Sequence, residues 1–336
     1  MSSPNSLGSG LGSAVLATGL CLFGLSSYAT AAPISMSSAF ILTQVSDDGT
    51  LGNGSVFPGL QHDPAGTGSF NENQDYLQPG TPFEGFGFRS AETGEIGNRN
   101  SDAAGSVGGD DDFIQDFLTD LSGGTFDNHV RWGGTSADGF VTIVHDFFFN
   151  NDDELINIET SITANVDLAD ASFARAIDPD PDNFPSGGTA ETINFRGLDL
   201  NTDGDLDDPG EIAENSFVGS EGAINGAALA LFSDDPLLHN TGIVTECCTV
   251  IDPDRYLSGG DFPSSTGDNG IGIAFFMGDL TAGQTVTINY AYVLGDTVVT
   301  VDLPDDPTDV PEPASLVIFG LGLAGLVAGR RRFLVR

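Results

Sequence analysis

Lysine is absent from the 336-residue chain, and ten arginines are its only permanently basic side chains. Four of them, Arg330, Arg331, Arg332 and Arg336, lie in the last seven residues. The other six stand against all 49 acidic residues, so the chain without its basic end has a formal charge of 6 − 49 = −43. Such a surface repels nucleic acid and anionic membranes, which excludes polyanion binding unless cations bridge the two.

Cysteine is also scarce, with three residues in the whole chain. Cys21 falls in an apolar N-terminal run, so only the neighbours Cys247 and Cys248 remain for the rest of the protein. Bonding between adjacent cysteines requires a strained ring and a distorted backbone. A disulfide between Cys247 and Cys248, two reduced thiols, and a bridge to another chain therefore all stay open.

Short catalytic motifs are missing too. The four histidines are scattered, and we find no HExxH zinc motif, no GxSxG nucleophile turn after the N-terminal run and no phosphate-binding glycine loop. We expect no enzymatic activity and no catalytic residue. A secreted hydrolase is the alternative, and it would require a cleft that holds two carboxylates with separated pKa values.

Helical periodicity is hard to find between the two ends of the chain, whereas alternation of period two is frequent. The sequence predicts an all-β protein, a β-sandwich flanked by an N-terminal signal helix and a single C-terminal transmembrane helix. At residues 111–121 the apolar spacing allows either a helix or a strand. The predicted strands are 141–149, 155–164, 171–176, 192–195, 227–232, 242–250, 271–277 and 284–294, with the last two forming a hairpin.

The two ends of the chain carry apolar runs. Residues 11–25 have the length of a secretory signal core, and Ala29-Thr30-Ala31 offers small residues for cleavage, so we expect a signal peptide at 1–31. Near the other end, residues 314–329 carry no charge and would span roughly 24 Å as a helix, somewhat less than a ~30 Å hydrocarbon core. The arginines that follow mark the cytoplasmic side of the predicted transmembrane helix.

These features define the predicted domains. The β-sandwich ectodomain covers 32–301, with a division into two packed subdomains near 110–138 as an option. An acidic linker covers 302–309, and a C-terminal signal covers 310–336. Pro311, Glu312 and Pro313 form a stiff extended element, because proline fixes φ and biases its predecessor away from helix.

Pro311-Glu312-Pro313, the short apolar helix and Arg330, Arg331 and Arg332 together resemble the PEP-CTERM protein-sorting signal of surface-bound proteins in Gram-negative bacteria. The resemblance implies that an exosortase recognises the Pro-Glu-Pro element, cleaves near it and releases the body outward. The precursor would lie in the inner membrane and the mature form at the cell surface or outside the cell. An ordinary anchor that stays attached is the alternative. Parts of the body also look like the β-sandwich ectodomains of other PEP-CTERM proteins.

An acidic segment at 199–211 is the strongest local motif. Ca²⁺ takes six to eight hard oxygen ligands, and carboxylates alternating with spacers around a glycine turn supply them from one loop. We expect a structural Ca²⁺ site, with an acidic turn that binds no ion as the alternative. The predicted ligands are Asp199, Asn201, Asp203, Asp205, Asp207 and Glu211.

A second acidic element is Asp178-Pro179-Asp180-Pro181-Asp182, in which the prolines keep the chain extended. We expect a solvated loop here, with a second cation site or a sugar-binding rim as alternatives.

Three functions agree with these features. The first is an exported structural or adhesive protein, stabilised by Ca²⁺, that acts at the cell surface or in an exopolysaccharide matrix. The second is a carbohydrate-binding module, and the third is the secreted hydrolase.

Overall fold

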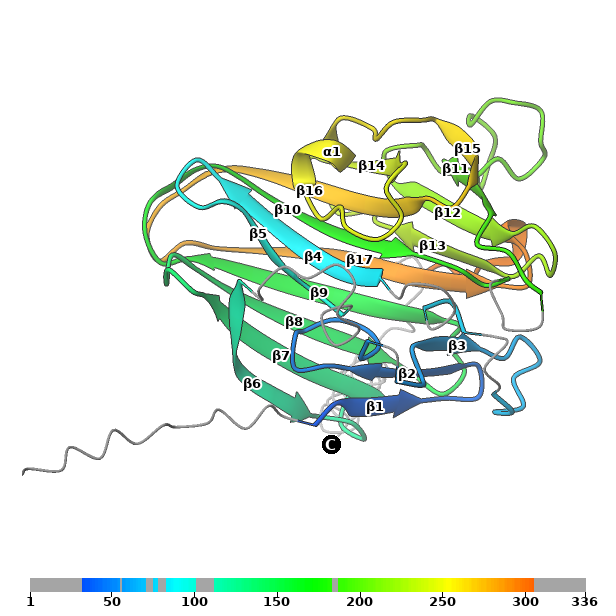
Figure 1. Cartoon of the computed structure of the whole chain (residues 1–336), viewed down its shortest axis with the longest axis horizontal. Coiled ribbons are helices and arrows are strands. Elements are labelled where there is room, and N and C mark those ends of the chain that lie inside the picture. The colour runs from blue at the N-terminus through cyan, green and yellow to red at the C-terminus, as the bar shows by residue number, and fades with distance from the viewer. Residues whose placement is uncertain are drawn as a thin grey trace, which may run out of the picture. The chain divides into compact units, whose positions relative to one another are not determined.

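A computed structural model describes residues 32–54, 56–70, 75–77, 83–100, 112–182 and 187–304. These residues fall in one compact unit that begins at Ala31. They form an all-β fold in which every strand pair is antiparallel, arranged as a nine-stranded, a five-stranded and a three-stranded sheet (Figure 1). The predicted all-β class is confirmed for these residues.

The nine-stranded sheet carries the longest run of alternating sequence. Its strands, in spatial order, are β15 (Ser264–Gly267), β11 (Thr192–Arg196), β12 (Phe217–Gly222), β13 (Ala228–Phe232), β17 (Thr285–Gly295), β9 (Leu155–Ala164), β8 (Val141–Phe149), β7 (Asn128–Ser136) and β6 (Phe113–Asp120). The predicted limits of β8 and β9 are confirmed, and every second side chain of both strands is buried, as their alternating sequences indicate. Residues 113–120, whose spacing allowed a helix, form strand β6.

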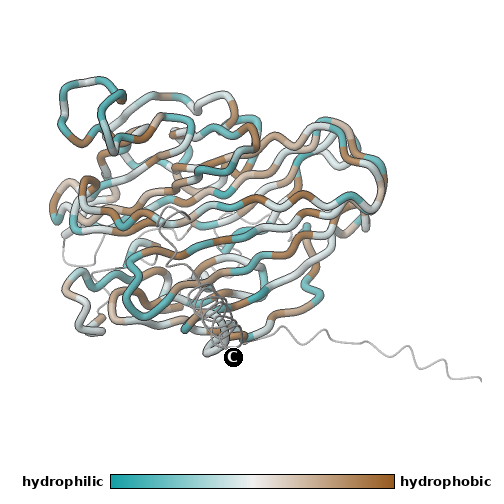
Figure 2. The backbone as a smooth tube through the Cα atoms, turned by 180° about the vertical axis from the view of Figure 1, so that it is seen from behind, coloured by the Kyte–Doolittle hydropathy of each residue, from teal (hydrophilic) through white to brown (hydrophobic). Residues whose placement is uncertain are grey.

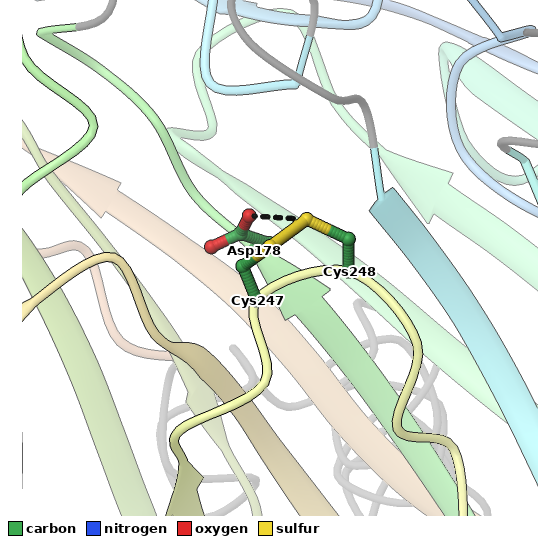
Figure 3. A group of neighbouring side chains, drawn as sticks. All are labelled: Asp178, Cys247 and Cys248. Atoms are coloured by element: carbon green, nitrogen blue, oxygen red, sulfur yellow. Dashed lines mark hydrogen bonds between the residues drawn. A yellow bond between two sulfur atoms is a disulfide. The ribbon is translucent and has the colours of Figure 1, made fainter. Parts of the chain in front are cut away.

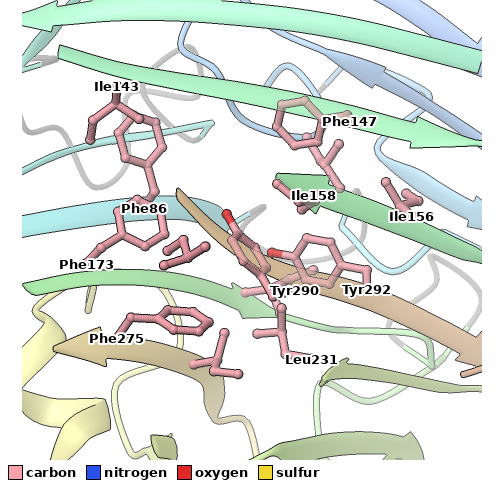
Figure 4. Packing of buried hydrophobic residues seen from close by; sticks show 14 of the residues in the cluster. Phe86, Ile143, Phe147, Ile156, Ile158, Phe173, Leu231, Phe275, Tyr290 and Tyr292 are labelled. Carbon is pink, nitrogen blue, oxygen red and sulfur yellow. The ribbon is translucent and has the colours of Figure 1, made fainter. Parts of the chain in front are cut away.

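The five-stranded sheet faces the nine-stranded sheet. Its order is β14 (His239–Val244), β16 (Gly270–Leu280), β10 (Leu168–Asp178), β4 (Phe83–Ser90) and β5 (Gly94–Arg99). Phe86, Phe173 and Phe275 project from this sheet toward Ile143, Phe147, Ile156, Ile158, Leu231, Tyr290 and Tyr292 of the other (Figure 4). The main core therefore lies between two sheets, as in a sandwich.

The predicted hairpin between the last two strands is wrong. β16 pairs with β10 and β14 in the five-stranded sheet, whereas β17 pairs with β9 and β13 in the nine-stranded sheet. The turn between them runs from one sheet to the other. It lies beside the connection from β9 to β10, which also joins the two sheets, and Gly283 N donates to Ala164 O at 2.7 Å. Alternation identifies the buried face of each strand, but it does not identify the sheet to which the strand belongs.

Two further segments cover the two large sheets, and the first contains the three-stranded sheet. The three-stranded sheet consists of β1 (Ile34–Ser37), β2 (Ile41–Val45) and β3 (Leu60–His62). The loop after β2 packs on Trp132, whose indole N–H donates to Asp47 O at 2.7 Å. Gly49 has φ +77° in this loop, and a Cβ there would lie 2.5 Å from the Trp132 ring, so only glycine fits.

A second cover lies on the outer side of the five-stranded sheet. Residues 245–262, which include helix α1 (Pro253–Leu257), pack on Phe83, Ala174, Ala176 and Ala274 through Cys248, Ile251 and Tyr256. β10 is consequently buried on both faces from Ala171 to Asp178. Figure 2 shows the alternation of hydrophobic and hydrophilic residues along the strands, with hydrophilic stretches at many of the loops.

Candidate functional site

The predicted calcium loop lies between β11 and β12 and is mostly exposed. Its side chains accept hydrogen bonds from the backbone of the same loop: Asp199 from Thr202 N (2.6 Å) and Gly204 N (3.0 Å), and Asp203 from Asp205 N (3.2 Å). Gly204 has φ +95°, which agrees with its predicted role at the turn.

The remaining predicted ligands join the same network. Asn201 Nδ2 donates to Asp208 at 2.5 Å, Asp205 accepts from Asp207 N at 3.3 Å, and Glu211 accepts from Leu200 N at 3.2 Å and Asp208 N at 3.0 Å. This is the geometry of successive Asx turns. In the described part of the chain, however, no three of the acidic side chains of this loop offer oxygens that all lie within 4.8 Å of one another, so whether the loop binds Ca²⁺ stays a prediction.

The Asp-Pro-Asp-Pro-Asp element is not solvated, contrary to the prediction. Asp178 and Asp180 are each 3% exposed and Asp182 is fully buried. Asp182 accepts hydrogen bonds from Ile224 N and Asn225 N and so closes the turn between β12 and β13. The composition of this element suggested a surface loop, but the covering segment 245–262 and the strands around β10 bury it.

Asp178 ends β10 and meets two other acidic groups. One ligand oxygen each from Asp178, Asp180 and Asp268 lie within 4.8 Å of one another. Asp268 is exposed and sits in the tight connection between β15 and β16. Burial, followed by the charges of Asp180 and Asp268, raises the pKa of the Asp178 carboxyl well above its ordinary value.

The two cysteines lie against the same carboxylate. Cys247 and Cys248 are joined by a disulfide, and the Asp178 carboxylate is 3.5 Å from Cys248 Sγ (Figure 3). The predicted strand 242–250 is too long, since β14 ends at Val244 and the two cysteines lie in the loop that follows. The loop geometry allows adjacent residues to bond, whereas in a strand they would point to opposite faces.

A buried ion pair lies between the neighbouring strands β4 and β10 of the five-stranded sheet. Glu84 and Arg175 are fully buried, and Arg175 Nε donates to Glu84. The same carboxylate accepts from Tyr292 OH (2.7 Å) and Leu51 N (2.7 Å), and the guanidinium lies 5.2 Å from the Phe147 ring centroid. The pair joins both large sheets to the loop after β2, and no sequence motif marked it.

The histidines have structural contacts. His129 Nε2 lies 2.6 Å from Asp146 and His62 Nε2 lies 2.9 Å from Glu154. His145 is fully buried, and burial, followed by the charge of Arg175, lowers the pKa of its imidazole well below its ordinary value.

The outer face of the nine-stranded sheet carries rows of hydroxyl groups. We define this outer face as the side chains of β7, β8, β9 and β17 that point away from the core. Thr135, Thr142, Thr163 and Thr285 are aligned across the four strands. Thr135 and Thr142 are 3.1 Å apart and Thr163 and Thr285 are 2.8 Å apart, measured between hydroxyl oxygens. The face is therefore a nearly continuous polar strip.

A small pocket of about 90 Å³ lies where this outer face meets the C-terminal end of the described chain. Phe148, Asn157, Asp234, Asn289 and Pro304 are among its lining residues. Phe148 stacks on Phe126 with ring centroids 4.2 Å apart. The pocket combines an aromatic surface with amide and carboxylate groups, but it is smaller than the ~300 Å³ at the lower end for drug-sized ligands.

Other predicted segments lie outside the described residues. These are the signal peptide at 1–31, most of the linker, and the sorting residues Pro311, Glu312, Pro313, Arg330, Arg331 and Arg332. The predicted membrane span 314–329 also lies outside, and no helix in the described part of the chain is long and apolar enough to cross a membrane. At the start of the linker, Asp302 accepts a hydrogen bond from Glu154 N at 3.1 Å, so this residue packs on the body.

The family model described as a PEP-CTERM protein-sorting motif matches residues 309–332. The chain thus carries a PEP-CTERM sorting motif at the predicted position. This motif implies export, sorting to the cell surface and processing by an exosortase. No curated protein matches the chain in sequence.

Several solved structures resemble the fold. A bacterial glucoamylase complexed with acarbose is 10% identical with a TM-score of 0.46, and the match covers 80% of this chain and 33% of that one. A galactose mutarotase related enzyme from Lactobacillus acidophilus is 10% identical with a TM-score of 0.34, covering 81% and 100%. An alpha-galactosidase from Lactobacillus brevis is 11% identical with a TM-score of 0.37, covering 78% and 39%. The chain spans about a third of the glucoamylase, and likenesses at this level carry no argument about function.

Proposed function

We propose that the protein is a structural or adhesive component of the cell surface or of an exopolysaccharide matrix. The sorting motif at 309–332 supports its delivery to that location. The observation that carries the molecular role is the outer face of the nine-stranded sheet, where hydroxyl groups repeat across four adjacent strands. A broad polar strip suits many weak contacts with a hydrated polymer rather than one deep contact with a small molecule.

The charge of the body limits the class of polymer. With a formal charge of −43 outside the basic end, the protein is repelled by polyanions unless cations intervene. A neutral polysaccharide, whose hydroxyl groups exchange hydrogen bonds with threonine and serine, is the matching partner.

Ca²⁺ binding by the loop at 199–211 belongs to the same proposal. Asp199, Asn201, Asp203, Asp205, Asp207 and Glu211 would hold the ion. The loop projects between β11 and β12 and is tied by hydrogen bonds within itself, so an ion would stiffen a segment that has little core of its own. Its role would be structural.

A carbohydrate-binding module is the second candidate, and the small pocket beside Phe148 favours it. Phe148 offers a ring face to a sugar, while Asn157, Asn289 and Asp234 offer polar groups that fix its orientation. A secreted hydrolase would need two such carboxylates on opposite sides of a cleft, whereas this pocket has Asp234 among its lining residues as a single acidic group.

The two candidates are separated by binding experiments on protein purified from the medium or envelope of its host. The double variant Thr163→Val and Thr285→Val removes two hydroxyls of the strip and keeps the β-branched shape. Thr266→Val, on the exposed edge strand β15, is the matched control. In co-sedimentation with the host's neutral polysaccharide, the double variant should bind several-fold less and the control should bind normally.

The variant Phe148→Ala tests the pocket in the same assay. The surface-adhesion proposal predicts little change, because the strip and not the pocket makes the contact. If Phe148→Ala abolishes binding while the double threonine variant binds normally, the protein is a carbohydrate-binding module and the proposal is wrong.

A further inference from the structure

We propose that Asp178, Asp180 and Asp268 form a binding site for one divalent cation, Ca²⁺, at the carboxyl end of β10. The site is separate from the loop at 199–211 and does not depend on the proposed surface role. Three acidic side chains that lie close together do not by themselves make a site. The burial of Asp178 and its lack of hydrogen-bond donors among the described residues also indicate a bound ion.

Asp178 is 3% exposed, and its carboxylate has no N–H or O–H donor among the residues that the structure describes. Its one hydrogen-bonding contact is Cys248 Sγ at 3.5 Å, but a sulfur atom in a disulfide carries no hydrogen to donate (Figure 3). Asp182, four residues further on, shows the contrast, because two backbone N–H groups bind its carboxylate. A buried carboxylate without a donor costs free energy unless something neutralises it.

Arginine does not supply that neutralisation. Five of the six arginines of the body form ion pairs with other acids, and no ion pair within 4.0 Å reaches Asp178 or Asp268 in the described part of the chain. Asp178 can then be neutralised in one of two ways, by a proton that leaves its carboxyl uncharged or by a bound cation.

The geometry fits Ca²⁺. Oxygen ligands lie about 2.3–2.6 Å from this ion, so ligands on opposite sides of it are about 4.6–5.2 Å apart. The three carboxylate oxygens lie within 4.8 Å of one another and can therefore share one shell. The disulfide removes Cys247 and Cys248 as thiolate ligands, which leaves a hard, all-oxygen set. Asp268 is exposed, so the ion can enter from solvent and keep water molecules as further ligands.

Calorimetric titration of CaCl₂ into the chelator-treated protein, purified from its host, tests the proposal. The titration is done in the Asp203→Asn variant, which weakens the loop at 199–211, so that the remaining binding reports the second site. Asp268→Asn is the test substitution, because an exposed side chain can lose its charge without harming the fold. Asp152→Asn, in the exposed turn after β8, is the matched control.

We expect the Asp203→Asn protein to bind about one Ca²⁺ and to unfold at a higher temperature when Ca²⁺ is present. Adding Asp268→Asn should weaken this binding at least about tenfold and leave the unfolding temperature of the metal-free protein unchanged, whereas Asp152→Asn should alter neither. Equal affinity with Asp268→Asn and Asp152→Asn would overturn the proposal. Absence of Ca²⁺ binding in the Asp203→Asn protein would also overturn it and would mean that protons neutralise the cluster.

Discussion

Replacing Glu84 by glutamine should be among the most destabilising single changes in this protein. Glu84→Gln keeps the size of the side chain but removes the negative charge that faces Arg175 in a site where both residues are fully buried. Arg175 cannot relieve this by losing its proton, because an arginine side chain stays protonated in proteins. The variant therefore leaves a permanent positive charge buried without an anionic partner.

Breaking one side of a buried ion pair costs about 3–5 kcal/mol. For a body of this size, each kcal/mol lowers Tm by about 2–4 °C, so we expect a fall of about 6–20 °C. Arg175→Met should cost less than Glu84→Gln, because the Glu84 carboxyl that remains can take up a proton. Burial, which outweighs the neighbouring arginine, already raises the pKa of this carboxyl above its ordinary value.

The two single variants and the double variant Glu84→Gln with Arg175→Met form a double-mutant cycle, in which the double variant is decisive. It buries no charge, so it should be more stable than Glu84→Gln alone. Unfolding in guanidinium chloride can be followed through Trp132, the single tryptophan, which is buried 5.6 Å from Phe86 between ring centroids. If the two single effects add, or if Glu84→Gln costs less than about 1 kcal/mol, the Glu84 charge does not offset a buried Arg175 charge.

Three further outcomes follow from the contacts described. Gly87→Ala would place a Cβ 2.0 Å from Ile251 O and should cost at least about 1–3 kcal/mol in denaturant, while Gly124→Ala, with its nearest contact at 3.3 Å, should unfold almost normally. Asp63 accepts hydrogen bonds from the hydroxyl and three amides of the following turn, and the hydroxyl bond first of all lowers the pKa of its carboxyl. A carboxyl whose pKa is lowered by folding contributes stability above its unfolded pKa of about 3.9, and this stability is lost as the pH falls through the folded pKa. Asp63→Asn should therefore lower Tm at pH 7 and not at pH 2, and equal losses at both pH values would contradict this. The Asp268→Asn protein can be saturated with Ca²⁺ at about 100 times the Kd of the loop at 199–211. A chelator should then lower its Tm by about 5–11 °C, and an unchanged Tm would show that this loop does not bind Ca²⁺.

The strands could be predicted where one face of the strand is buried and the other is exposed to solvent. β8 and β9 show this pattern along their whole length, which is why their limits follow from the sequence. The pairing of β16 with β10 and of β17 with β9 could not be predicted in this way, because the paired residues lie 94 or more positions apart in the chain (271 − 177 = 94) and alternation looks the same in either sheet.

The candidate sites show the same limit. The loop at 199–211 is local, so its residue spacing indicated the turn that the structure contains. The burial of Asp178 depends on β4, β16 and the segment 245–262, and Asp268 reaches it from 90 residues further along the chain. Composition suggested a solvated loop, because tertiary packing rather than sequence decides which acidic residues are buried.

The intact mass of the protein from its own host, measured separately in envelope and medium fractions, tests the central claim of export and sorting most directly. We expect a chain that begins near Ala32 and ends near Pro313, about 2 Da lighter than its fully reduced form because Cys247 and Cys248 are joined. A chain in the membrane fraction that retains Arg336 would contradict processing at the sorting motif and would make the protein an anchored one.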